Sequence, residues 1–89
     1  MPYEWDQAKA KVNLRKHGVS FADAVLALED PQSLTMADPD ASGEQRFVSL
    51  GSDAKGRVLV TVFAPRGRRT RIISSRTASR NERRAYENQ

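Results

Sequence analysis

The stretch that most constrains the fold is the apolar segment RVLVTVFA at residues 57–64. Valines at alternate positions fill one parity of this segment, and Leu59 and Phe63 fill most of the other. A half-buried strand alternates apolar with polar residues, whereas a strand that is apolar on both parities is typical of a sheet centre with both faces covered. The segment therefore predicts a central strand around which the rest of the chain is arranged.

Shorter strand candidates surround this segment. Residues 46–50 alternate and precede it across the loop GSDAKG, and residues 70–76 follow it across the turn at 65–67. Residues 32–37 fit a short edge strand. This spacing predicts an antiparallel meander sheet of three to four strands.

Capping residues delimit three helices. Asp6 is a good N-cap for a helix that runs to about His17, and Gly18 is the expected stop. Ser20 opens a second helix, whose apolar residues recur at helical spacing and which ends at Asp30–Pro31. On the first helix, one face carries Lys9, Asn13 and Lys16.

A final helix begins at Ser79, where Glu82 stands at the third helical position and completes a capping box. The element order is helix, helix, strands, helix, which predicts an α+β fold with the two N-terminal helices on one face of the sheet and the C-terminal helix on another side. Eighty-nine residues fit one domain, 1–89.

The composition excludes several classes of protein. The chain has no cysteine and one histidine, which argues against disulfides and against a zinc site of the usual kinds. Neither a secretory signal nor an apolar run long enough to cross a bilayer is visible, so no membrane partner is expected. We expect a cytoplasmic protein.

The charge of the chain is polarised. The net charge is +4, yet residues 1–45 hold four basic and eight acidic residues, whereas residues 46–89 hold eleven basic and three acidic. From 69 to 87 the chain has six arginines and no lysine. The planar guanidinium makes paired, charge-assisted hydrogen bonds to phosphate, so the basic half predicts a surface for a polyanion. The alternative is a solvated basic surface, in which the aliphatic stems of the arginine side chains shield a thin core.

The arginines of adjacent strands, Arg57 included, and of the last helix are expected to converge on one side or one end of the sheet. We assign Arg76 and Arg46 to stabilising charge on a reacting phosphate. If the polyanion is RNA, we expect Arg71, Arg80 and Arg83 to hold the strand on either side of that phosphate.

Three further side chains are candidates, each with a structural alternative. His17 can act as general acid or base, or it can complement the dipole at its helix end. Glu44 stands two residues before Arg46, so it can serve as a base or form an ion pair. Tyr86 can stack on a base as part of the RNA-binding set, or it can close the last helix onto the sheet.

This inventory fits RNA cleavage by the strand's own 2′-hydroxyl. The reaction needs an in-line geometry, a base, an acid and cations for the developing charge, and it needs neither metal nor cofactor. A non-catalytic module that binds RNA or DNA shares every charge feature, and so does an interaction protein whose basic groove accepts an acidic or amphipathic partner segment.

Three stretches resemble the BrnT toxins of bacterial type II toxin–antitoxin modules. They are EWDQAKAKVNLRKHGVSF near the start, DPDASGEQRFVSLG in the middle and RIISSRTASRNERRAYE at the end. The resemblance covers Tyr3 to Glu87. One departure is Ser75, since family members often read ISAR where this chain has ISSR.

The resemblance implies a fold similar to RelE-type ribonuclease toxins, metal-independent endonucleolytic cleavage of RNA, and inhibition of translation. It also implies a cognate antitoxin resembling BrnA, which binds promoter DNA as a complex with the toxin. The family's signature positions here are His17, Glu44, Arg46, Arg71, Arg76, Glu82 and Tyr86.

Overall fold

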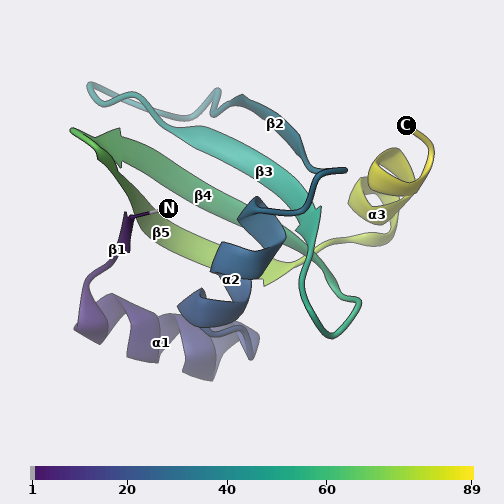
Figure 1. Ribbon diagram of the computed structural model, residues 1–89, viewed down its shortest axis with the longest axis horizontal. Helices are drawn as coiled ribbons and strands as arrows, with labels where there is room; N and C mark the ends of the chain where they lie inside the picture. The colour runs from purple at the N-terminus through teal and green to yellow at the C-terminus, as the bar shows by residue number, and fades with distance from the viewer. Residues whose placement is uncertain (1) are drawn as a thin grey trace.

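The computed structural model describes residues 2–89. Its elements, in chain order, are β1 (Tyr3–Glu4), α1 (Gln7–His17), α2 (Phe21–Leu28), β2 (Leu34–Ala37), β3 (Phe47–Ser52), β4 (Val58–Arg66), β5 (Arg69–Thr77) and α3 (Arg80–Glu87). Figure 1 shows α2 lying across the sheet, α1 running beside its β5 edge, and α3 set apart at one end of the strands.

The sheet has five strands in the order β1-β5-β4-β3-β2. Strands β2 to β5 form the expected antiparallel meander. The prediction of three to four antiparallel strands is wrong at one edge, because β1 adds a fifth strand that pairs in parallel with β5 through Tyr3 and Glu4. A strand of two residues has no periodicity, and only its tertiary partner reveals it.

The central strand is β4, as expected, but its two faces are covered unequally. Leu59 packs against Ala27 of α2, and both Leu59 and its same-face neighbour Thr61 are almost fully buried. On the opposite face Val60 is buried, while Val62 is only half-buried and lines an open cleft. The expectation that both faces are covered is therefore wrong for part of the strand. The α3 helix lies against β3 at one end of this second face.

The N-terminal helices begin and end where their caps predict. Asp6 accepts a hydrogen bond from the Lys9 backbone at 2.9 Å, and Gly18 ends α1 in the left-handed conformation at φ 68°. Phe21 and Ala24 of α2 pack against Ile72 of β5 to form the main core cluster.

The α2 helix lies unusually close to β3. A Cβ atom built on Gly51 would stand 2.1 Å from the backbone oxygen of Ala27. Only glycine fits at this point of β3, because real Cβ atoms do not approach backbone that closely.

Asn13 attaches α1 to the edge of β5. Its side-chain amide donates to the carbonyl of Ser75 at 2.8 Å and accepts from the backbone N–H of Ser75 at 3.1 Å. It also donates to the carbonyl of Val19 at 3.0 Å. Because β1 ends at Glu4, the Asn13 amide takes the place that a neighbouring strand's peptide group would occupy.

We expect Asn13→Ala to lower the free energy of unfolding by about 2–4 kcal/mol, because it leaves the backbone groups of Ser75 buried without partners. Urea unfolding monitored by circular dichroism measures the loss. Lys11→Ala, an exposed substitution on the same helix, is the control and should stay within about 0.5 kcal/mol of wild type. Equal stability of the two variants would contradict this role of Asn13.

Candidate active site on the open face of the sheet

A cleft opens on the sheet face opposite α2. We call it the central cleft; its volume is about 410 Å³ and its described lining is His17, Asp38, Asp40, Val48, Val60, Val62, Ser74, Ser75, Arg76 and Glu82. Its floor is formed by β3, β4 and β5, and its sides come from the end of α1, the loop after β2 and the first turn of α3. Segments far apart in the sequence thus meet in one concavity.

Arg76 is held in this cleft by Glu82. Its two terminal nitrogens donate to the two carboxylate oxygens at 2.8 and 2.9 Å, and one of them also contacts the carbonyl of Thr77 at 3.3 Å. A guanidinium has five N–H donors, so the remaining two are not used by any hydrogen bond within residues 2–89. Its side chain is 45% exposed. Arg76 is therefore oriented in advance and still has donors for an anion.

Glu82 performs two tasks at the start of α3. One carboxylate oxygen accepts from Arg76 and from the backbone N–H of Ser79, which closes the capping box expected from the sequence. The hydrogen bonds from Arg76 are the largest cause that lowers the Glu82 pKa, and they bring it to about 2. Glu82 therefore stays ionised near neutral pH, where it orients Arg76 and is a poor proton acceptor.

We expect Glu82→Gln to remove a pH-dependent part of the stability. The pKa of Glu82 is about 2 in the folded protein and 4.5 ordinarily, so its stabilisation is complete above about pH 4.5 and is lost as the pH falls towards 2. After allowance for solvent screening we expect about 1 kcal/mol. Urea unfolding at pH 7 and pH 3 should show a smaller difference for Glu82→Gln than for wild type. Glu87→Gln, at an exposed ion pair of the same helix, should match wild type; the same result for Glu82→Gln would refute the coupling.

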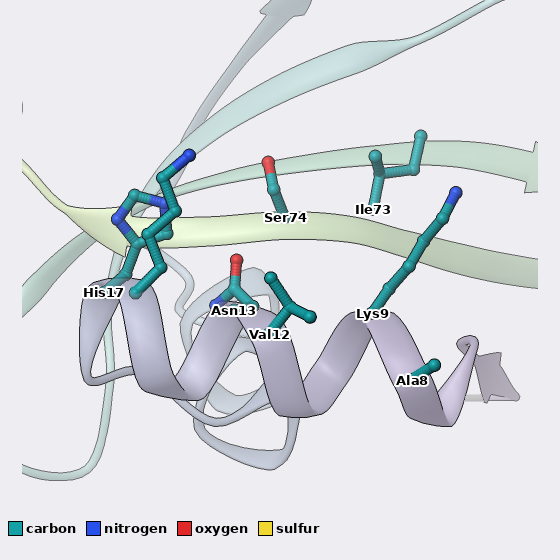
Figure 2. Close-up of a pocket in the computed structure, with 8 residues that line it drawn as sticks. Ala8, Lys9, Val12, Asn13, His17, Ile73 and Ser74 are labelled. Atoms are coloured by element: carbon teal, nitrogen blue, oxygen red, sulfur yellow. The ribbon is translucent and has the colours of Figure 1, made fainter.

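His17 is the last residue of α1 and stands between two hollows. Besides the central cleft it lines the α1–β5 hollow, a depression of about 340 Å³ whose described lining is Ala8, Lys9, Val12, Asn13, Lys16, His17, Ile73 and Ser74. Figure 2 shows α1 alongside β5, with Lys9, Val12 and His17 projecting from the helix towards the strand. Ser74 also lines both hollows, so the two lie side by side.

Glu44 and Arg46 lie together outside the described lining of the cleft. The carboxylate of Glu44 is 3.6 Å from Nε of Arg46 and 3.1 Å from a terminal nitrogen of Arg66. This contact is the ion pair that the sequence left open as one alternative. A catalytic role for either residue stays a prediction.

Arg71 shares the sheet face of the cleft but lies further along β5. It pairs with Ala64 of β4, which is two residues from Val62 and therefore on the same face. The Glu4 carboxylate lies 2.8 Å from its terminal nitrogen, and the side chain is 30% exposed. Arg71 thus lies on the cleft side of the sheet, at the end where β1 pairs with β5.

The α3 candidates divide into two groups. Arg80 and Arg83 are exposed, and Arg83 pairs with Glu87 at 3.1 Å. Tyr86 instead turns inward, and its hydroxyl donates to Asp30, which raises the pKa of Tyr86. The hydroxyl thus fastens α3 to the segment between α2 and β2, and stacking of Tyr86 on a base stays a prediction.

The arginines as a group do not converge as expected. Among the described residues Arg76 is the one arginine that lines the central cleft. Arg57, expected to join the others, is bound by Asp53 at 2.8 Å and Asp23 at 3.0 Å, and it donates to the carbonyl of Gly18. Arg57 connects the loop before β4 to the start of α2, because its charge-assisted hydrogen bonds to two nearby carboxylates replace hydrogen bonds to water.

Asp38 and Asp40 also line the cleft, although neither is among the site residues predicted from the sequence. They lie in a turn-rich loop, and nothing in their spacing marks them as neighbours of His17 and Arg76. In residues 2–89 no three His, Cys, Asp or Glu side chains form a group that could hold a metal ion. Within the same range no helix has both the length and the apolar character to span a membrane.

Fold and cleft together define a small α+β protein that presents an imidazole and an oriented guanidinium on an open sheet face. The comparisons agree with this class. A family model described as the ribonuclease toxin BrnT of type II toxin–antitoxin systems matches residues 5–82. The chain therefore belongs to the BrnT family, and membership implies an RNA substrate and an antitoxin partner.

One solved structure is similar over nearly the whole chain. It is the 1.1 Å crystal structure of the Brucella abortus ribonuclease toxin BrnT, with 28% sequence identity and a TM-score of 0.67. The match covers 90% of this chain and 99% of that one. No curated protein matched the chain.

Proposed function

We propose that this chain is a metal-independent endoribonuclease that cuts RNA in the central cleft by means of the substrate's own 2′-hydroxyl. The observation that supports this best is the joint presence of His17 and the Glu82-oriented Arg76 in one concavity. Attack of the 2′-oxygen on the adjacent phosphorus breaks the bond to the 5′-oxygen, so the products are a 2′,3′-cyclic phosphate and a 5′-hydroxyl.

Each step has a candidate side chain. The free donors of Arg76 stabilise the charge that develops on the phosphate oxygens. His17 transfers a proton to or from a reacting oxygen, since an imidazole has one nitrogen that can donate a proton and one that can accept it. Besides Glu82, which pairs with Arg76, the cleft is lined by the carboxylates of Asp38 and Asp40. These two are candidates for the second proton transfer. Glu44 and Arg46 lie outside the described lining, so we assign them a lesser part.

The flanking RNA would follow the open face in both directions. Towards one end it reaches Arg71 on β5, and towards the other it passes Arg80 and Arg83 on α3. These contacts hold the backbone without reading its sequence, since guanidinium groups bind phosphates of any nucleotide.

We further propose that the chain acts as a single domain, 1–89, in the cytoplasm, where RNA cleavage inhibits translation. Its antitoxin would be BrnA-like, would cover the cleft, and would carry the part that binds promoter DNA. The support for this is family membership and the need of any such toxin to be silenced by a partner.

Incubation of the purified chain with RNA, in chelator and separately in magnesium, tests the activity. We expect cleavage in both conditions. We also expect expression of the chain to arrest growth, and co-expression of the antitoxin to restore growth. RNA that stays intact in both conditions, with normal growth, would favour the non-catalytic binding module.

A further inference from the structure

We propose that the α1–β5 hollow is a nucleotide subsite. It takes the base of a nucleotide next to the cleft, while Lys9 and Lys16 bind the adjoining phosphates. This inference rests on the proposed function, which places an RNA strand in the central cleft.

A β-bulge builds one wall of the subsite. Ser74 pairs with Val62 and Ile72 pairs with Phe63, which leaves Ile73 without a partner on β4. An extra residue in one strand re-aims its side chain and kinks the strand. Ile72 is consequently buried in the core at 2% exposure, whereas Ile73 lines the hollow. The bulge thus places an apolar side chain beside the cleft.

The opposite wall comes from α1. Val12 is 54% exposed and lines the hollow, although its helix has a buried contact with β5 only one residue further, at Asn13. Val12 from α1 and Ile73 from β5 therefore give the hollow two apolar lining residues. Apolar side chains are suitable partners for the flat faces of an extruded base. The volume of about 340 Å³ is at the small end of the range for small-molecule sites.

The charge of the hollow favours RNA. Lys9, Lys16 and His17 line it, and no carboxylate belongs to its described lining, in contrast to the central cleft. Neither Lys9 nor Lys16 forms an ion pair with another of the described residues. Free ammonium groups beside an apolar slot match a nucleotide, which joins an apolar base face to an anionic phosphate.

The position of the hollow beside the cleft points to its occupant. His17 and Ser74 line both hollows, so a strand whose phosphate lies at Arg76 and which continues along β5 towards Arg71 passes over this depression. A neighbouring nucleotide is therefore the group that reaches it without further rearrangement.

The test uses an RNA that cannot be cut, so that binding is measured apart from catalysis. Fluorescence anisotropy follows a 2′-O-methyl oligoribonucleotide in which one abasic site is moved along the strand. For the wild type we expect one position beside the cleft where base removal weakens binding about five- to tenfold. In Val12→Glu, which places a carboxylate in the subsite, affinity for the intact strand should fall about tenfold and the abasic effect should disappear.

Leu14→Glu is the matched control. Leu14 is 51% exposed on the same helix but lies outside the hollow, so this variant adds the same charge to α1 elsewhere. It should retain most of the wild-type affinity and the position-dependent abasic effect. Equal affinities of Val12→Glu and Leu14→Glu for the intact strand would overturn the subsite. That result would favour a protein partner as the occupant of the hollow.

The outcomes separate the subsite from the catalytic proposal. A position-dependent abasic effect without any cleavage of ordinary RNA would support the subsite and reject the nuclease. If the wild type cuts ordinary RNA but its affinity does not depend on the position of the abasic site, the subsite is rejected and the proposed nuclease activity is retained.

Discussion

Replacing Arg76 by alanine should lower kcat/KM for RNA cleavage by about 10²–10³, the usual effect of removing one oriented donor from a developing anion. Arg76 is suited to this task because Glu82 fixes its plane through two hydrogen bonds and leaves two donors free. Expression of the variant should no longer arrest growth. Single-turnover cleavage of a labelled oligoribonucleotide measures the rate.

The fold should survive this substitution. The Arg76–Glu82 pair is 45% and 32% exposed, and exposed ion pairs contribute at most about 1 kcal/mol. Arg84→Ala, which removes an exposed arginine of α3 outside the cleft, controls for loss of net charge and should stay near the wild-type rate. A folded Arg76→Ala protein that cuts RNA as fast as Arg84→Ala would remove Arg76 from the mechanism.

Replacing His17 by alanine should lower kcat by about 10²–10⁴, the range for loss of a general acid or base. The wild-type pH–rate profile should contain a bend that is absent from the variant, because a general acid or base works in only one of its protonation states. Cleavage rates measured from pH 5 to 9 provide both results.

The alternative role of His17 predicts a different outcome. If the imidazole only complements the end of α1, its removal costs about 0.3–1 kcal/mol of stability and leaves the rate intact. Arg15→Ala is the control, since Arg15 is a cation in the same last turn that does not line the cleft. Similar activities for His17→Ala and Arg15→Ala would make the histidine structural.

Local signals explain which parts of the fold were predictable. Asp6, Ser20 and Ser79 are caps whose side chains bond the backbone three residues on, so the helix starts follow from neighbouring residues alone. The central strand likewise follows from its own apolar run. The β1 strand does not, because two residues pair with β5 only after the whole chain has folded.

The site was less predictable, because ion pairs depend on contacts between distant segments. The sequence shows Arg57 and Arg76 as equivalent arginines beside strands. In the structure the first is neutralised by Asp23 and Asp53, whereas the second lies in the cleft. Asp38 reaches the same cleft from the loop after β2, where nothing in the spacing marks it as a neighbour of Arg76. Sequence alone indicated candidate residue types but not which of them share a concavity.

The measurement that tests the central claim most directly is cleavage of an RNA with a single 2′-deoxy nucleotide at the cut position, followed by analysis of the product ends. The central cleft is proposed to use the substrate's 2′-hydroxyl, so the all-ribose strand should be cut in chelator to a 2′,3′-cyclic phosphate and a 5′-hydroxyl, while the substituted strand stays intact at that position. Cleavage of the 2′-deoxy strand at the same bond, or products with a 3′-hydroxyl and a 5′-phosphate, would contradict it.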